Sequence, residues 1–399
     1  MINNTRINGL FFHDDIIIKQ KEDVMPLIRY AGDIAVRLMS NFEFSLNEDP
    51  NVSNLFVVKI EPMHVNPGTT NPLDHIRKII DAIENNGYNN QKDTLILMLV
   101  SEGDSSWNQQ MNTYVNAIRP NYSKENIYFA NEQLNSQKES PDLLKKISFF
   151  NISVEVSKES LEIWNLIHDI PKDKLFLSFN RRPNYHRTQL VLRLINDNLI
   201  EHGIVSFYNQ IDDSNVNDII DSMVNKTEEE KSLYKTQLKN NLILDNIQNG
   251  CLDLTSDLIQ NYYKRTYFSI VTETRAKKSE LSFTEKTFKP IGNKHPFIIL
   301  GVPGLIKWLR KMGFKTFHPM INESYDEIDD YELRFNSIMS EVNRLSNLSQ
   351  IELEDFWNKT KEITEYNFNY FNSDEFFNRV DYCTELFPFI EKFKSELEN

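Results

Sequence analysis

The sequence has 399 residues, of which 40% are apolar and 26% are charged, and its formal net charge is −14. A chain of this length exceeds one compact core and is typical of two globular domains. The acidic balance argues against broad non-specific nucleic-acid binding, because that binding depends on lysine and arginine side chains that displace counterions. Two cysteines, Cys251 and Cys383, are too few for a disulfide framework.

Residues 1–165 alternate short apolar runs with amphipathic segments, which predicts an α/β domain. Strands are predicted at 55–60, 95–100, 127–130 and 147–156, and a further apolar run at 10–18 is interrupted by polar residues at 13–15. The run at 95–100 is unbroken, as in a parallel sheet covered on both faces. Glu102 and Asp104 follow this strand and are candidates for acid–base chemistry, although each also fits an ordinary loop acid. His13 and Asp14 form a third, weaker candidate.

The second half begins after a predicted hinge at 159–173. Its predicted strands are 174–178, 204–208, 267–271, 297–300 and 314–317, and its predicted helices include 185–199, 254–264, 328–345 and 351–368. The aromatic residues that crowd positions 366–377 have helical spacing and are expected to form core.

The stretch 268–304 has the order strand, polar turn, helix start, strand. Ser282 and Thr284 are the predicted N-cap candidates of a short helix that carries Glu285 and Lys286 and that ends by Gly292. Open α/β sheets bind ligands beyond the carboxyl ends of their strands, and helix N-termini attract anions. Glu285 is suited to accept two hydroxyl donors and Lys286 to neutralise a phosphate. The same triplet also fits an ordinary capped helix start with a solvated ion pair.

These residues resemble the donor-binding core of the fucosyltransferases of the GT-B glycosyltransferase class. The matching positions in the stretch are Glu273 and Thr274, then Thr284–Lys286, then 296–301. A second match lies upstream, where an apolar strand at 175–177 leads into a Ser-Asn turn and an arginine at a helix start. Its residues are Ser178, Asn180 and Arg187. The resemblance covers about 170–310, and none is found in the first 165 residues.

The resemblance implies that Arg187 and Lys286 hold the diphosphate of a nucleotide sugar and that Glu285 meets the sugar or ribose. Glu273 and Thr274 would line the same pocket. Thr274 stands where the family has asparagine, and Lys294 and His295 stand where small residues are usual.

Other enzyme classes lack their motifs in this sequence. The eight histidines are scattered without a ligand pair, and no Asp-x-Asp is present to hold a nucleotide-bound cation, so no metal site is predicted. No glycine-rich loop of the dinucleotide or Walker type occurs among the 11 glycines. No Gly-x-Ser-x-Gly elbow occurs either, which argues against an α/β hydrolase.

Together these features predict two Rossmann-like α/β domains of GT-B type with a cleft between them. The predicted parts are an acceptor-side domain at 1–165, a donor-binding domain at 166–350, and C-terminal helices at 351–399 that pack back across the domains. The predicted activity is metal-independent transfer of a hexosyl or pentosyl group from a nucleotide-diphosphate sugar, the co-substrate, to a glycan or other hydroxyl acceptor. An inverting transfer needs a base, for which Glu102 is the first candidate and Asp104 the second.

Two alternatives stay open. The chain could act on a hydroxymethylated DNA base, as some phage glycosyltransferases do, or it could be a non-catalytic binding or scaffold protein with the sugar-nucleotide fold. No membrane span is expected, and the start of the sequence lacks the basic and apolar regions of a signal peptide, so a cytoplasmic location is expected.

Overall fold

The computed structural model describes residues 170–211, 214–242, 244, 257–277, 281, 283–373 and 375–376. It also describes the backbone of seven strands in the first 169 residues and, at 211, 214, 257–259 and 285, the backbone alone. The chain divides into two compact units. One consists of 1–155, 280–283 and 378–399, and the other of 156–279 and 284–377. Each unit contains its own sheet.

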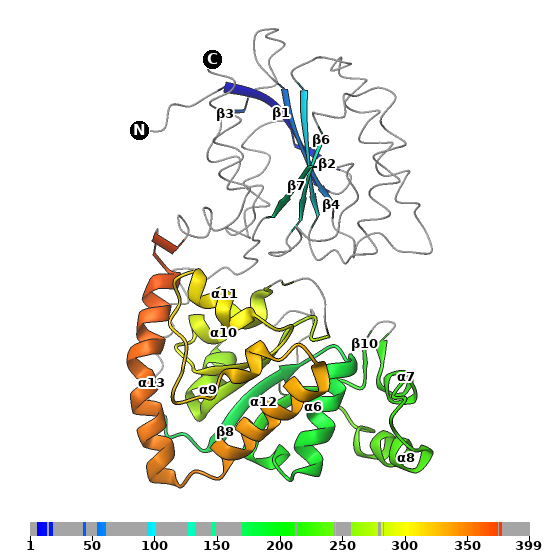
Figure 1. The fold of residues 1–399 in the computed structure, drawn as a ribbon, viewed down its shortest axis with the longest axis vertical. Coiled ribbons are helices and arrows are strands. Elements are labelled where there is room, and N and C mark those ends of the chain that lie inside the picture. Colours follow the sequence, from blue (N-terminus) through cyan, green and yellow to red (C-terminus); the bar gives the residue numbers. More distant parts are fainter. Residues whose placement is uncertain are drawn as a thin grey trace. The chain divides into compact units, whose positions relative to one another are not determined.

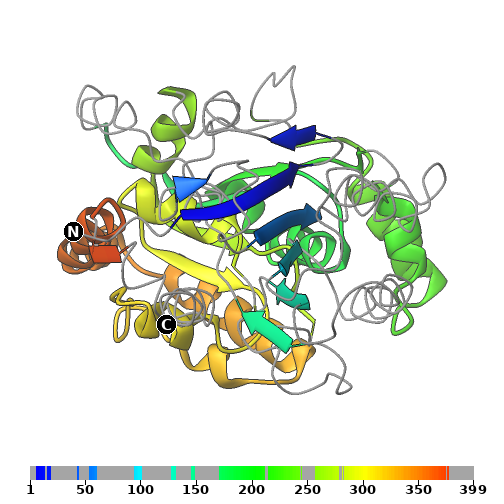
Figure 2. The same ribbon diagram turned by 90° about the horizontal axis from the view of Figure 1, so that it is seen from above.

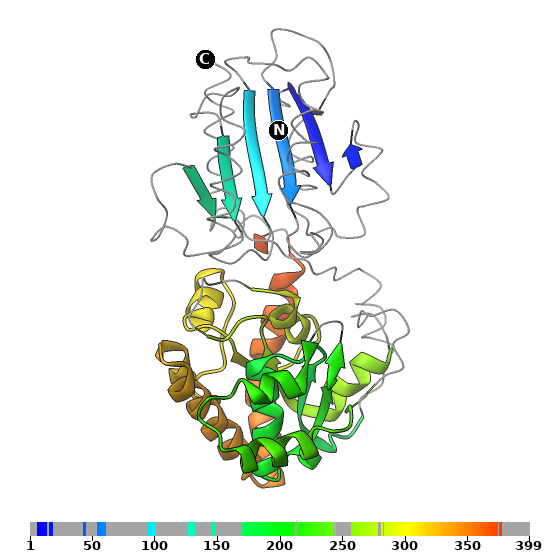
Figure 3. The same cartoon turned by 90° about the vertical axis from the view of Figure 1, so that its right-hand side faces the viewer.

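The sheet of the first unit is mostly parallel. Its strands are β1 (Arg6–His13), β2 (Ile16–Ile18), β3 (Glu43–Phe44), β4 (Asn54–Ile60), β5 (Thr94–Val100), β6 (Ile127–Asn131) and β7 (Lys145–Ser148). They are ordered β2-β1-β4-β5-β6-β7, with β3 beside β1, and only β2 is antiparallel to its neighbour. Figure 3 shows the parallel strands side by side. The predictions at 55–60, 95–100 and 127–130 are confirmed, whereas β7 starts and ends earlier than the predicted strand.

The sheet of the second unit has four strands, which all pair in parallel. They are β8 (Lys174–Asn180), β9 (Gly203–Phe207), β12 (Thr266–Thr272) and β13 (Phe297–Leu300), in the order β13-β12-β8-β9. Every residue of β12 and β13 is buried, because helices and loops cover the sheet on both faces. The chain runs from β8 to β9 on one side and then crosses back to β12. This reversal of strand order between β8 and β12 marks the place where open α/β sheets accept ligands.

Eight helices surround this sheet in the described part of the chain. They are α6 (Tyr185–Asn196), α7 (Val216–Asp221), α8 (Glu228–Gln237), α9 (Asp257–Arg265), α10 (Glu285–Gly292), α11 (Leu305–Lys311), α12 (Tyr331–Ser346) and α13 (Gln350–Phe371). Figure 1 shows α6 and α12 side by side. In both Figure 1 and Figure 2 the long helix α13 and the helix α8 lie at opposite ends of the unit. No helix in the described residues is long and apolar enough to cross a membrane.

Smaller elements complete the unit. They are the 3-10 turns η3 (Ile200–His202) and η4 (Ser324–Glu327) and a two-stranded ribbon of β10 (Gln210–Ile211) and β11 (Ser214–Asn215).

Four of the aromatic residues predicted to form core are buried, namely Phe368, Tyr370, Phe371 and Phe376, whereas Tyr366 is exposed and Phe377 lies outside the described residues. Phe371 stacks on Phe288 of α10 with ring centroids 5.5 Å apart and an interplanar angle of 11°. Phe376 and Phe314 join the same group, with their ring centroids 5.1 Å apart. This cluster packs α13 against α10, the helix predicted to carry the phosphate-binding lysine.

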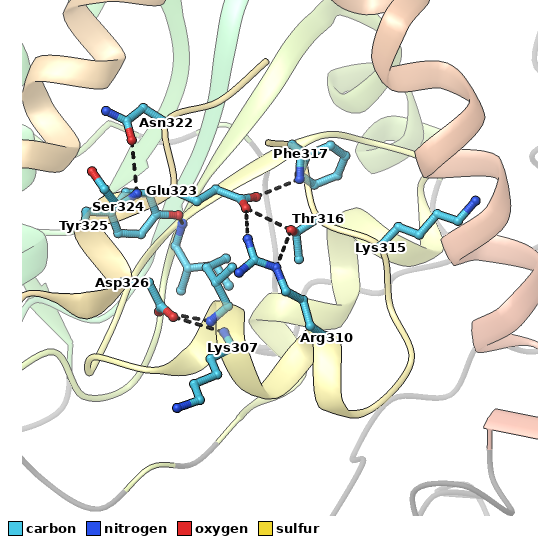
Figure 4. A network of polar contacts seen from close by, with 12 residues as sticks. Lys307, Arg310, Lys315, Thr316, Phe317, Asn322, Glu323, Ser324, Tyr325 and Asp326 are labelled. Atoms are coloured by element: carbon cyan, nitrogen blue, oxygen red, sulfur yellow. Dashed lines mark hydrogen bonds and ion pairs between the residues drawn. The ribbon is translucent and has the colours of Figure 1, made fainter. Parts of the chain in front are cut away.

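Buried carboxylates organise the segment between β13 and α12 (Figure 4). The strand predicted at 314–317 is wrong, because the Phe317 N–H donates to Glu323 Oε1 at 2.6 Å instead of pairing with a neighbouring strand. Asp326 caps α11, since its carboxylate accepts the N–H groups of Ile306 and Lys307, both at 3.0 Å. The residue before α11, Gly304, offers no side chain for this purpose.

We therefore expect Asp326→Ala to lower the free energy of unfolding by about 2 kcal/mol, because the substitution leaves two helix N–H groups without acceptors. Hydrogen exchange at the amides of Ile306 and Lys307 should accelerate. The matched control is Asp329→Ala, which removes an exposed carboxylate three residues away. Equal stability of the two variants in urea unfolding would contradict the capping role.

Candidate functional site

Ser178 and Asn180 lie at the carboxyl end of β8 and are buried. Asn180 Nδ2 donates to Ser178 Oγ at 2.9 Å, and Thr272 Oγ1 donates to Asn180 Oδ1 at 2.9 Å. Ser178 Oγ donates to the carbonyl of Ile270 at 3.1 Å. The two predicted site residues therefore tie β8 to β12 across the point where the strand order reverses. These side chains therefore hold the two strands in position, because their polar atoms make hydrogen bonds to other protein groups.

Arg187 lies in the first turn of α6, where the Asn184 side chain caps the helix by accepting the Arg187 N–H at 3.0 Å. Arg187 is only 6% exposed. Its Nη1 donates to the carbonyl of Arg182 at 3.1 Å, and its Nη2 donates to the carbonyl of Thr272 at 3.2 Å. The guanidinium therefore joins the turn after β8 to the end of β12 and places a positive charge between them.

His186, beside Arg187, was not predicted as part of the site. Its Nε2 lies 2.7 Å from the carbonyl oxygen of Glu273. Burial, reinforced by the charge of Arg187, lowers the pKa of His186 to about 3, and Lys286 and Lys277 act in the same direction. The imidazole is thus neutral at pH 7, and because a carbonyl oxygen only accepts, Nε2 carries the proton. The only signal for His186 in the sequence is its place next to Arg187 at a helix start.

Glu273 follows β12 and is 1% exposed. Its carboxylate accepts from Thr284 Oγ1 at 2.5 Å, from the Thr284 N–H at 3.3 Å and from Thr287 Oγ1. Gly301, after β13, allows this approach, since a Cβ there would lie 3.3 Å from the Glu273 Cβ and 2.4 Å from a methyl group of Leu305. Glu273 therefore anchors the start of α10 to the end of β12.

Of the two predicted N-cap candidates, Thr284 is the N-cap of α10, and its Oγ1 accepts the Lys286 N–H at 3.4 Å. The Lys286 ammonium lies 3.3 Å from Thr284 Oγ1 and 3.5 Å from Thr274 Oγ1. Unlike Arg187, Lys286 is only half-buried. Its charged group therefore lies at the carboxyl end of β12, beside the N-terminus of α10.

The structure brings most of the predicted donor-site residues to one edge of one sheet. Arg187 contacts the carbonyl of Thr272, and Lys286 contacts the hydroxyl of Thr274, so both cations meet the same three-residue segment. Glu285 begins α10, but its side chain lies outside the described residues, and so do the proposed bases Glu102 and Asp104.

Chemically, this edge combines cationic groups with the positive end of a helix, which favours binding of an anion such as a phosphate. In the part of the chain that the structure describes, no group of three or more His, Cys, Asp or Glu side chains could hold a metal ion.

Comparisons with known proteins add little. No protein-family model matches the chain, and no curated protein matches it. Among solved structures, the apo structure of OtsA is 9% identical to this chain, with a TM-score of 0.42. The alignment covers 95% of this chain and 75% of the OtsA chain. The N-terminal domain of the Candida albicans trehalose-6-phosphate phosphatase is 8% identical with a TM-score of 0.43, covering 94% of this chain and 97% of its own. Similarity at this level carries no argument about function.

A second imidazole, His295, is also buried in this unit. Its Nδ1 lies 2.8 Å from Ser269 Oγ on β12, and its ring packs edge-on against Tyr263, with centroids 5.2 Å apart. Burial, with a smaller contribution from the charge of Lys172, lowers the pKa of His295 to about 3.

Because both imidazoles are buried and neutral in the folded protein, we expect the free energy of unfolding to fall in acid. A folded-state pKa of about 3 lies below the unfolded value near 6.5, so the stability is full above pH 6.5 and is lost as the pH falls toward 3. Each imidazole should lower the free energy of unfolding by about 2 kcal/mol when the pH falls from 7.5 to 5. Urea unfolding should give free energies of unfolding at these two pH values that differ less for His295→Gln than for the wild type. The exposed control His318→Gln should behave as the wild type, and an unchanged pH dependence in His295→Gln would refute the assignment.

Proposed function

We propose that this chain is a glycosyltransferase that moves a hexosyl or pentosyl group from a nucleotide-diphosphate sugar to a hydroxyl acceptor without a metal ion. One observation supports it above all. Arg187 and Lys286, which are 99 positions apart in the sequence, both contact residues 272–274 where the strand order of the sheet reverses. Ligands of open α/β sheets bind at such points, and the charge there suits a diphosphate.

The two cations would have different tasks. Lys286 is half-buried and its ammonium lies 3.3 Å from Thr284 Oγ1 and 3.5 Å from Thr274 Oγ1, at the edge of the sheet where the diphosphate would bind, so it would contact the diphosphate directly. Arg187 is held by two carbonyl groups and would act through its fixed positive charge and by keeping the turn after β8 in place. The N-terminus of α10 would add its N–H groups to the same anion.

In the reaction, the bond between the anomeric carbon and the diphosphate oxygen would break as the acceptor oxygen bonds to that carbon. Negative charge would build up on the leaving diphosphate. Stabilisation by Lys286 would therefore be stronger in the transition state than in the ground state and would raise the rate. In an inverting transfer, the acceptor proton would pass to Glu102 or, as second candidate, to Asp104.

The remaining residues would orient the donor. Glu285 would accept hydrogen bonds from a diol of the ribose or sugar, as in the fucosyltransferase-like arrangement. Glu273 is already bound to Thr284 and Thr287, so its part would be to hold α10 rather than to touch the donor. The GT-B arrangement, with residues 1–165 on the acceptor side and a glycan as acceptor, belongs to the same proposal.

A thermal-shift assay with UDP and GDP tests the proposal. We expect at least one diphosphate to raise the melting temperature of the wild type, since a ligand that binds the folded state stabilises it. Lys286→Ala should weaken that binding about tenfold or more, because a charge-assisted contact is lost. The control Lys307→Ala removes an exposed ammonium from α11 and should bind as the wild type. No response to any nucleoside diphosphate would favour the scaffold alternative.

A further inference from the structure

A groove with a volume of about 450 Å³ runs along α6 and is closed by α12 and by the chain from Met223 to Tyr234. Its α6 side extends from Tyr185 to Asp197, a length of about 18 Å at 1.5 Å per helical residue. None of the residues predicted for the donor site lines it. Its size is that of a small-molecule binding site, and its length suits an elongated ligand.

The floor of the groove is apolar. It is formed by four side chains that are each less than 10% exposed, namely Leu192, Met223, Tyr234 and Phe335. A ligand seated there must offer apolar surface, such as the C–H faces of a sugar ring, to these side chains.

The walls carry side-chain amide groups whose hydrogen-bonding capacity is unused or only partly used within the described residues. Among the described residues, the side chains of Asn225 and Asn336 have no hydrogen-bond partner, and the Asn196 amide is bound only through its oxygen, to Gln237 Nε2 at 3.0 Å. An amide offers both donors and acceptors, as a hydroxyl group requires of its partner. These side chains therefore match a ligand that carries many hydroxyl groups.

The end of the groove near Tyr185 is rigid. Gln189 Nε2 donates to Glu332 Oε2 at 2.9 Å, and Tyr331 donates its hydroxyl to Gln189 Oε1. The Tyr185 hydroxyl lies 3.4 Å from Glu332 Oε1. This network joins α6 to α12, so the groove is formed before any ligand arrives, which reduces the entropic cost of binding.

The charges of the lining cancel. The two cations Arg193 and Lys226 are matched by the two carboxylates Asp197 and Glu332. In addition, Arg193 Nε bonds Asp197 Oδ2 at 2.8 Å, and Lys226 bonds Glu230, outside the lining, at 3.1 Å. Each cation of the lining is thus paired with a carboxylate, while the Lys277 ammonium lies over the Tyr185 ring at one end of the groove, 3.9 Å from its centroid.

We propose that this groove binds a neutral oligosaccharide. An apolar floor, unused amides, a rigid frame and a balanced charge favour a chain of uncharged sugar rings over a nucleotide or a sugar phosphate. The site lies outside the residues proposed for the nucleotide-sugar donor, and the inference holds whether or not the chain transfers sugars.

The test uses the full chain on an array of neutral and anionic glycans, followed by calorimetric titration with maltotriose and triacetylchitotriose as defined neutral probes. Binding of neutral glycans is expected. The double variant Asn225→Ala/Asn336→Ala should weaken it about tenfold, because two hydrogen-bonding side chains are lost. Asn336→Trp, which fills the groove, should abolish it. Neither Asn225 nor Asn336 is needed for folding, since both side chains are exposed and make no internal hydrogen bond in the described structure.

The control is Asn217→Ala, an exposed asparagine on α7 outside the lining, which should bind as the wild type. Lys286→Ala should also keep glycan binding, so that failure of the donor site and failure of the groove are told apart. The inference is overturned if no neutral glycan binds at millimolar concentration, if only anionic glycans bind, or if Asn336→Trp binds as well as the wild type.

Discussion

The buried carboxylate of Glu273 is the contact on which the candidate site depends. It follows β12 directly and accepts hydrogen bonds from Thr284 and Thr287, at the start of α10. A charged group in such a place is costly unless its oxygens are bonded, so the two threonines are required where they stand. Their position fixes the N-terminus of α10 and, with it, Lys286. Gly301 belongs to the same constraint, because any larger residue would push against Glu273 and Leu305.

A second set of contacts ties α6 to the same strand end. Arg187 donates to the carbonyl of Thr272, and neutral His186 donates to the carbonyl of Glu273. Two helix starts are thus attached to one three-residue segment by groups that are themselves buried. The result is a fixed edge at which one lysine is half-buried, which is the preorganised electrostatic arrangement that a reaction with a charged leaving group requires.

The local signals in the sequence were enough to predict most elements of the second unit. The strand at 297–300 agrees with the structure residue by residue, and the N-cap of α10 is one of the two predicted candidates, Thr284. The strand predicted at 314–317 does not form, although its sequence is of strand type, because the Phe317 N–H donates to the side chain of Glu323 instead of to a neighbouring strand. Such bonds, like those of Glu273, join residues that only the folded chain brings together. The groove along α6 was also beyond prediction, since α12 contributes its wall from more than 130 positions further along the chain.

The central claim is that a nucleoside diphosphate binds at the carboxyl ends of β8 and β12. A crystal structure of the chain soaked with UDP or GDP tests it most directly. The account predicts diphosphate oxygens about 3 Å from Lys286 Nζ and facing the first N–H groups of α10. A diphosphate bound elsewhere, or an empty edge at a saturating concentration of both nucleotides, would contradict the claim.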